Sequence, residues 1–206
     1  MLQVDETTVG EHFSLQPSDQ CFYLWEYSAR QRYDFSPTNQ LIANLKIKPS
    51  QIAASPRRDY YKQQAIEHAA SALRSLIQPD WVEHLGTLIP MPPSKIVGDP
   101  DHDERIGEVL RVAFRGFDAD IRPLMEQTES TAADHESTER LSFAALLGVM
   151  RIAETQAQAP RRNIAVVDDV LNSGKHFKVA QYLLSQRFPG IPIIGVFLAR
   201  CIRHDA

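Results

Sequence analysis

Cysteine and long apolar runs are both scarce in this chain of 206 residues. Its 2 cysteines, Cys21 and Cys201, lie far apart and form no C-x-x-C pattern, so we expect two reduced thiols and no zinc site. The longest strongly apolar run, "IPIIGVFLA", is roughly half as long as a membrane span. The acidic N-terminus lacks the basic and apolar regions of a signal peptide. We therefore expect a cytoplasmic protein that makes no membrane contact.

A strong charge of either sign is also missing. The chain has 22 basic and 26 acidic residues, and its formal net charge is -4. This balance argues against a surface that coats nucleic acid, so we do not expect direct nucleic-acid binding, although a local basic groove is compatible with it. The sequence contains no Ser-His-Asp pattern, Walker loop or dinucleotide fingerprint. What remains is an ordinary globular composition, with 43% hydrophobic and 23% charged residues.

The C-terminal part shows a strand, a helix and a second strand in direct succession. "NIAVVDDV" (163–170) predicts a buried strand, the apolar spacing over 175–187 predicts a helix, and "IPIIGVFLARC" (191–201) predicts a final strand. Amphipathic helices are expected over 55–77 and 103–116. Continuous apolar strands joined by helices predict an α/β fold, in which helices cover both faces of a twisted parallel sheet.

Three other segments have weaker patterns. Residues 1–20 are polar without a period and predict an arm or a frayed end. Residues 126–140 contain no large apolar side chain and predict a long mobile loop of the kind that often serves as a lid. A helical pattern resumes over 141–154.

Two adjacent aspartates, Asp168 and Asp169, end the apolar run "IAVV". Ligands of open parallel sheets bind beyond the carboxyl ends of the strands. The loop 172–176 contains glycine, serine and lysine and opens a helix, so its backbone N–H groups and the helix dipole favour a phosphate group. Carboxylates accept hydrogen bonds from ribose hydroxyls or hold Mg²⁺. The segment predicts a sugar-phosphate site with a metal, and an ordinary polar turn with a helix cap is the alternative.

The stretch "IAVVDDVLNSGK" (164–175) resembles the signature of the type I phosphoribosyltransferases. This resemblance implies a Rossmann-like core of that family's type, a phosphoribosyl pyrophosphate substrate and Mg²⁺ as cofactor. The acid pair, Asp168 and Asp169, would contact the ribose hydroxyls and the metal and take part in catalysis. The loop that would wrap the 5′-phosphate consists of Asn172, Ser173, Gly174, Lys175 and His176.

The loop departs from the family pattern at both ends. Family loops usually begin with Thr, Ser, Ala or Asp and end in Thr or Ser, whereas this loop begins with Asn172 and ends with His176. An asparagine cannot act as a general base at ordinary pH. A histidine still donates to phosphate, more strongly when it is protonated. Both departures bear on turnover more than on ligand binding.

A second segment, "TLIPMPPSK" (87–95), reads as a buried strand that enters a proline-stiffened loop. It is similar to the corresponding loop of the competence-associated phosphoribosyltransferase-like proteins. This similarity implies that Ser94 and Lys95 donate to the pyrophosphate and that Lys95 supports its departure. It also implies that Arg140 reaches the pyrophosphate from a closing loop. A proline-rich turn with a solvated lysine is the alternative.

The resemblance further implies a division into a small N-terminal hood or arm over 1–50 and an α/β core over 51–206. The function that it implies is a glycosyltransferase-class reaction, in which ribosyl phosphate passes from phosphoribosyl pyrophosphate to a nitrogen base. The alternative is a non-catalytic module on the same fold that binds phosphoribosyl pyrophosphate or a nucleotide and serves regulation or a DNA-related process. A homodimer is compatible with either function.

Overall fold

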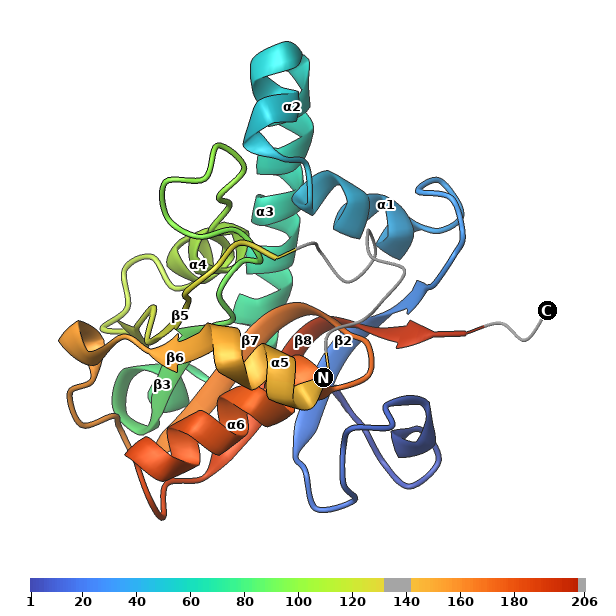
Figure 1. Ribbon diagram of the computed structural model, residues 1–206. Coiled ribbons are helices and arrows are strands. Elements are labelled where there is room, and N and C mark those ends of the chain that lie inside the picture. Colours follow the sequence, from blue (N-terminus) through green and yellow to red (C-terminus); the bar gives the residue numbers. More distant parts are fainter. Residues whose placement is uncertain (132–141, 204–206) are drawn as a thin grey trace.

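The computed structural model describes residues 1–131 and 142–203. A six-stranded sheet in the order β1-β2-β8-β7-β3-β4 crosses its centre (Figure 1). Every neighbouring pair in this sheet is parallel except the antiparallel pair β1 and β2. The predicted α/β fold with a mostly parallel sheet is therefore confirmed. The strands are β1 (Leu2–Gln3), β2 (Cys21–Ser28), β3 (Gly86–Pro90), β4 (Asp120–Ile121), β7 (Asn163–Leu171) and β8 (Ile193–Ile202).

Helices cover both faces of the sheet (Figure 1). The strand β7 shows why, because Ile164 and Val166 pack into one apolar cluster while Ala165 and Val167 pack into the other. This alternation buries both faces of a central parallel strand, as the apolar run predicted. The helices on the Ala165 face are α1 (Pro37–Leu45), α3 (Arg57–Leu76) and α4 (Arg105–Ala113), with α2 (Pro49–Ala54) preceding α3, and those on the other face are α5 (Phe143–Val149) and α6 (Lys175–Arg187).

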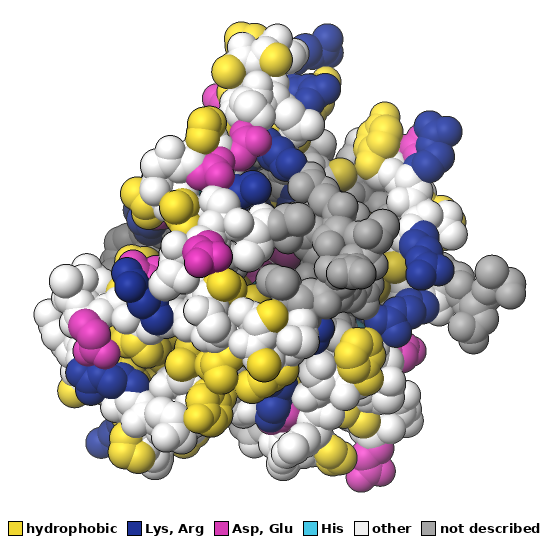
Figure 2. Space-filling model, viewed as in Figure 1, with side chains coloured by type: hydrophobic (Ala, Val, Ile, Leu, Met, Phe, Trp, Pro, Cys, Tyr) yellow, Lys and Arg dark blue, Asp and Glu magenta, His cyan; other side chains and the backbone are white. Residues whose placement is uncertain are grey.

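Short elements complete the chain. A two-stranded antiparallel sheet lies apart from the main sheet and pairs Gln127 with Met150. Figure 2 shows hydrophobic side chains gathered over α5 and α6, where the rings of Phe143 and Tyr182 meet edge to face. Among the described residues, no helix is long and apolar enough to cross a membrane. The remaining elements are η1 (Val9–Glu11), the π-helix η2 (Trp81–Leu85), β5 (Met125–Gln127), β6 (Met150–Ile152) and η3 (Glu154–Gln156).

Residues 1–20 do not form a frayed arm. Val4 and Leu15 are buried in the cluster on the α6 face, His12 is 0% exposed, and β1 pairs with β2. The sequence pattern misses this packing because isolated apolar residues in a loop have no period. The strand β2 itself joins the main sheet beside β8. The division into a hood over 1–50 and a core over 51–206 stays a prediction.

The segment 141–154 is helical only in part. The helix α5 ends at Val149, and the next three residues form β6, which pairs with β5. A partner strand that lies elsewhere in the chain overrides the local helical spacing here. Of the loop predicted over 126–140, the described part ends at Thr131, which donates a 2.8 Å hydrogen bond from its N–H to the Ser94 carbonyl. The rest of that loop lies outside the described residues.

Candidate functional site

The ends of two neighbouring strands bring the predicted site segments together. The register of β3 and β7 places Pro90 beside Val167, and the N–H of Met91 donates a 2.8 Å hydrogen bond to the Val167 carbonyl. The loop that follows β3 therefore starts next to Asp168. Because the strands are parallel, both segments lie at the carboxyl edge of the sheet, where open α/β sheets bind ligands.

Asp169 is buried in a double ion pair. Its Oδ2 accepts hydrogen bonds from Nε and Nη2 of Arg105 at 2.9 and 2.8 Å, and its Oδ1 lies 3.0 Å from Nζ of Lys46. Burial alone would raise the pKa of Asp169, but the charges of Lys46 and Arg105 hold that pKa well below its usual range. Asp169 is therefore an ionised anchor whose two oxygens both have cationic partners.

The ion pairs continue beyond Asp169 into a buried network. Nη1 of Arg105 lies 3.1 Å from Oδ2 of Asp103, and the other oxygen of Asp103 lies 2.6 Å from Nζ of Lys62. Lys62 is only 4% exposed. The network thus joins three cations, Lys46, Lys62 and Arg105, to two carboxylates. It has one positive charge in excess, which an ionised Asp168 next to it would balance.

Asp168 has different surroundings although it is the next residue in the strand. Lys46 and Arg105 form their ion pairs with Asp169, although the charges of both cations also lower the pKa of Asp168. It is half-buried, and its Oδ1 accepts a 2.7 Å hydrogen bond from the N–H of Asp169. Burial, together with the charge of Asp169, raises the pKa of Asp168 to about 7. Asp168 is therefore the member of the pair that exchanges a proton near neutral pH.

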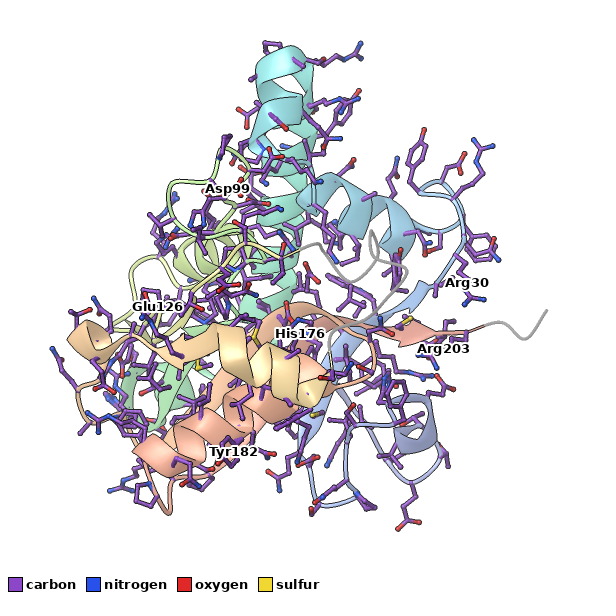
Figure 3. All side chains as sticks on the ribbon, viewed as in Figure 1. Arg30, Asp99, Glu126, His176, Tyr182 and Arg203 are labelled. Carbon is purple, nitrogen blue, oxygen red and sulfur yellow. The ribbon has the colours of Figure 1, made fainter. Side chains whose placement is uncertain are left out.

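The predicted phosphate loop leads from β7 into α6. Gly174 adopts φ 84°, a left-handed conformation that favours glycine, and it caps the 13-residue helix. Lys175 and His176 lie half-buried in the first turn, and Figure 3 shows His176 at the start of α6 near the end of β7. The first N–H groups of a helix have no partner within the helix and attract anions. The side chain of Ser173 is turned inward, and the residue is 3% exposed.

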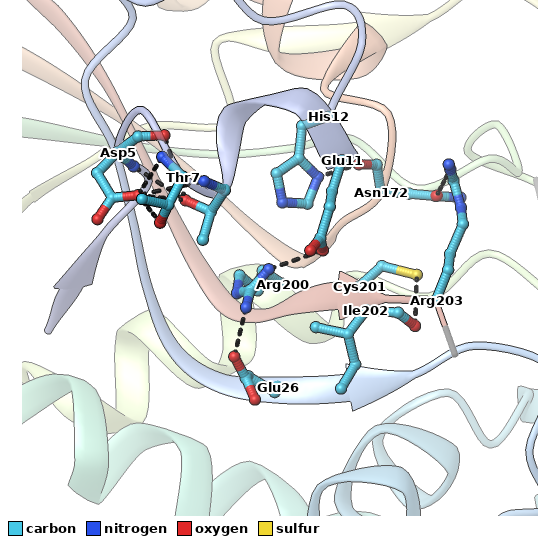
Figure 4. Close-up of polar contacts among 11 residues, drawn as sticks. Asp5, Thr7, Glu11, His12, Glu26, Asn172, Arg200, Cys201, Ile202 and Arg203 are labelled. Atoms are coloured by element: carbon cyan, nitrogen blue, oxygen red, sulfur yellow. Dashed lines mark hydrogen bonds and ion pairs between the residues drawn. The ribbon is translucent and has the colours of Figure 1, made fainter. Parts of the chain in front are cut away.

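A short N-terminal segment, His12–Leu15, braces this loop, and we call it the N-terminal strap. Nδ1 of His12 contacts the carbonyl oxygen of Asn172 (Figure 4). The N–H of Ser14 donates a 2.9 Å hydrogen bond to the Ser173 carbonyl. Leu15 lies so close to Gly174 that a Cβ on this glycine would be 2.6 Å from Cδ2 of the leucine. The strap thus fixes the backbone of the loop from outside.

Arg200 holds the strap to the sheet. Its guanidinium donates to Glu11 beside the strap at 2.8 Å and to Glu26 on β2 at 2.5 Å (Figure 4). The C-terminal end of β8 adds a further contact, because Nη2 of Arg203 donates a 3.4 Å hydrogen bond to Oδ1 of Asn172. The side chain of Asn172 is therefore directed toward Arg203 at the end of β8.

Ser94 and Lys95 lie in the loop that follows β3. The carbonyl of Ser94 accepts from Thr131, and the carbonyl of Lys95 lies 2.7 Å from Nδ1 of His102. These contacts use the backbone, so they engage neither the hydroxyl of Ser94 nor the ammonium of Lys95. Arg140 lies outside the described residues.

Sequence reasoning missed Lys46, Arg105 and His12. A signal existed for Arg105, because a cation in the first turn of a helix opposes the helix dipole and requires a carboxylate nearby. A buried aspartate at a strand end likewise requires a cation. The sequence does not say which cations pair with the aspartate, since Lys46 directly follows α1 and Arg105 begins α4. His12 has no such signal.

The described residues include no group of three or more His, Cys, Asp or Glu side chains that would hold a metal ion. Asp168 can supply one oxygen ligand to a Mg²⁺ ion that enters the site bound to a diphosphate. Asp169 cannot do so in the same way, because both of its oxygens already contact cations.

Comparisons of the chain with models of known protein families and with curated proteins found no match.

Proposed function

We propose that this chain binds the Mg²⁺ complex of phosphoribosyl pyrophosphate and transfers ribosyl phosphate to a nitrogen base. One observation supports this proposal above the others. The acid pair at the end of β7 lies between the glycine-containing loop that opens α6 and the loop that follows β3. A sugar with a phosphate at one end and a diphosphate at the other can contact all three segments at the carboxyl edge of the sheet: the phosphate loop, the acid pair and the loop after β3.

Each element has a distinct role in the proposed reaction. Asp168 accepts hydrogen bonds from the ribose hydroxyls, and Asp169 keeps the strand end rigid through Lys46 and Arg105. The N–H groups at the start of α6, with Lys175 and His176, hold the 5′-phosphate. Type I phosphoribosyltransferases, which the sequence resembles, use corresponding segments for these tasks.

The chemistry breaks the bond between C1 of the ribose and the pyrophosphate oxygen, and it forms a bond between C1 and the nitrogen of the base. Pyrophosphate leaves with the bonding electrons, so negative charge grows on the leaving group and positive charge grows on the sugar. Lys95 supports the leaving group, and the ionised Asp168 lies on the side of the sugar. The base loses its proton to solvent, because Asn172 cannot accept it.

A non-catalytic module is the second candidate, and a specific observation favours it. Asn172 opens the loop where a carboxylate base would serve turnover, and it is held by Arg203 and His12. Such a loop is held at its first residue and has no carboxylate base there. The module would bind phosphoribosyl pyrophosphate or a nucleotide as a signal and act through partners, in regulation or in a DNA-related process.

Calorimetry followed by a pyrophosphate-release assay tests both candidates. We expect phosphoribosyl pyrophosphate with Mg²⁺ to bind, and we expect Asp168→Asn to weaken binding by about tenfold, the effect of one hydrogen bond to a charged group. Glu154→Gln, an exposed carboxylate at η3, is the matched control and should bind like the parent protein. Release of pyrophosphate with a nucleobase supports the transferase, and binding without release supports the module. Absence of phosphoribosyl pyrophosphate binding contradicts the transferase, and absence of binding to AMP as well contradicts the module.

A further inference from the structure

A hollow lies away from the acid pair, between β2, α1 and α3. It has a volume of about 380 Å³, and we call it the Trp25 groove. Pockets for small ligands measure roughly 300–1,000 Å³. The residues that carry the argument are Trp25 on β2, Gln40, Leu41 and Asn44 on α1, and Gln64 and His68 on α3.

The groove offers aromatic surface to a flat ligand. The ring of Trp25 lies 5.5 Å from the imidazole of His68, and the two planes meet at 76°. Trp25 is half-buried, whereas His68 is exposed at the rim. Leu41 contributes an aliphatic wall. Flat rings pack well against such surfaces, in stacked or edge-to-face arrangements.

Most polar side chains of the groove are amides, and Thr38 and His68 add a hydroxyl and an imidazole. Gln40, Asn44 and Gln64 each present a carbonyl oxygen that accepts and an NH₂ group that donates hydrogen bonds. The described lining residues include no lysine, arginine, aspartate or glutamate, so they offer no fixed charge to pair with a phosphate or an ammonium group. The chemistry matches a neutral, flat molecule with both donors and acceptors on its rim.

We propose that the Trp25 groove binds a neutral purine base. The purine ring would pack against Trp25, and the amides would pair with its ring nitrogens and exocyclic groups. The proposal does not rest on the proposed function, because the groove shares no residue with the acid pair. The two regions are nevertheless neighbours, since α1 carries Asn44 in the groove and is followed by Lys46, which contacts Asp169.

Fluorescence tests the proposal directly because the chain has 2 tryptophans, Trp25 and Trp81. In a Trp81→Phe protein, adenine should quench the emission of Trp25 along a saturable curve. In the matched Trp25→Phe protein, where Trp81 is the reporter, adenine should cause no saturable change. A flat response of Trp25 up to about 1 mM adenine, a limit that already corresponds to very weak binding, would overturn the proposal.

Calorimetry of adenine binding to alanine variants tests the role of the amides, and two adjacent glutamines on α3 provide a matched pair. We expect Gln64→Ala and Asn44→Ala each to weaken adenine binding by about fivefold, the effect of one neutral hydrogen bond. Gln63→Ala is the matched control, because Gln63 lies outside the groove lining and is exposed. Equal affinities of the Gln63→Ala and Gln64→Ala proteins would contradict the proposal.

Asp168→Asn separates this proposal from the proposed function. The substitution should weaken binding of phosphoribosyl pyrophosphate by about tenfold and leave adenine binding unchanged. If adenine binding disappears with it, adenine binds at the acid pair and the groove proposal fails. Adenine binding that persists in a protein that never binds phosphoribosyl pyrophosphate supports the groove and contradicts only the proposed function.

Discussion

The N–H of Asp169 donates a 2.7 Å hydrogen bond to the carboxylate of Asp168, yet the two side chains have opposite electrostatic surroundings. Asp169 lies between Lys46 and Arg105 and stays ionised, whereas burial raises the pKa of Asp168 to about 7. A sequence motif would treat the two acids as equivalent. Asp169 therefore stabilises the fold through its ion pairs, and Asp168 is the group that exchanges a proton. Substitution of the two residues should have different effects.

Asp169→Asn should destabilise the protein at neutral pH. The change removes the carboxylate that balances Lys46 and Arg105, whose side chains are 26% and 22% exposed. We expect a loss of about 3 kcal/mol in the free energy of unfolding, at the lower end of the range for a broken buried ion pair. Urea denaturation measures this loss. An unchanged midpoint would show that the network contributes nothing.

Asp168→Asn should act in the opposite direction, and its effect should grow with pH. The folded protein binds the proton of Asp168 more tightly than the unfolded chain does, because folding raises this pKa from 3.8 to about 7. The resulting stabilisation is full below the unfolded pKa and is lost as pH rises through about 7. An asparagine cannot ionise. Thermal melts should therefore favour the variant more at about pH 8 than at about pH 5, and a constant difference would refute this assignment.

The affinity for phosphoribosyl pyrophosphate should depend on the ionisation of Asp168. If the ionised form of Asp168 receives the ribose hydroxyls, the affinity for phosphoribosyl pyrophosphate should rise with pH and level off above about 7. Lys46 lowers the pKa of Asp168, so Lys46→Met should move the midpoint of this profile to higher pH. Arg58→Met, at an exposed position on α3, should leave the midpoint in place. Calorimetry across the pH range measures both, and a shared midpoint would contradict the assignment.

Two glycines with nearly the same backbone test the N-terminal strap. Gly174 has φ 84° and Gly190 has φ 82°, but only Gly174 faces a close neighbour, Leu15. Gly190→Ala should cost about 1–2 kcal/mol, the usual penalty for a left-handed alanine. Gly174→Ala should cost more than this and should weaken phosphoribosyl pyrophosphate binding, because Leu15 and the loop must move apart. Equal losses in the free energy of unfolding, measured by urea denaturation, would mean that Leu15 moves aside without a penalty.

The sequence predicts the part of the fold in which neighbouring elements pack on each other. β7, α6 and β8 follow one another, and their apolar patterns need no distant partner. The acid pair and the glycine loop are predictable for the same reason. Lys46, Arg105 and His12 are not, because each reaches the site from a separate segment that tertiary packing positions. The strand β6 is unpredictable for the same reason, because its pairing with β5, a distant part of the chain, makes it a strand.

The position of β2 in the sheet has a consequence for how the chain folds. β2 pairs with β8 from Cys21 beside Gly195 to Ser28 beside Ile202, and among the described strands only the two-residue β1 pairs with its other side. During synthesis β2 leaves the ribosome long before β8 is made. Its backbone groups and aromatic side chains therefore stay unpaired and exposed until β8 can pair with it. Such non-local pairing is slow and leaves an aggregation-prone edge exposed. We expect the completion of this sheet to be the late, rate-limiting event in folding, and the stage at which a chaperone would help.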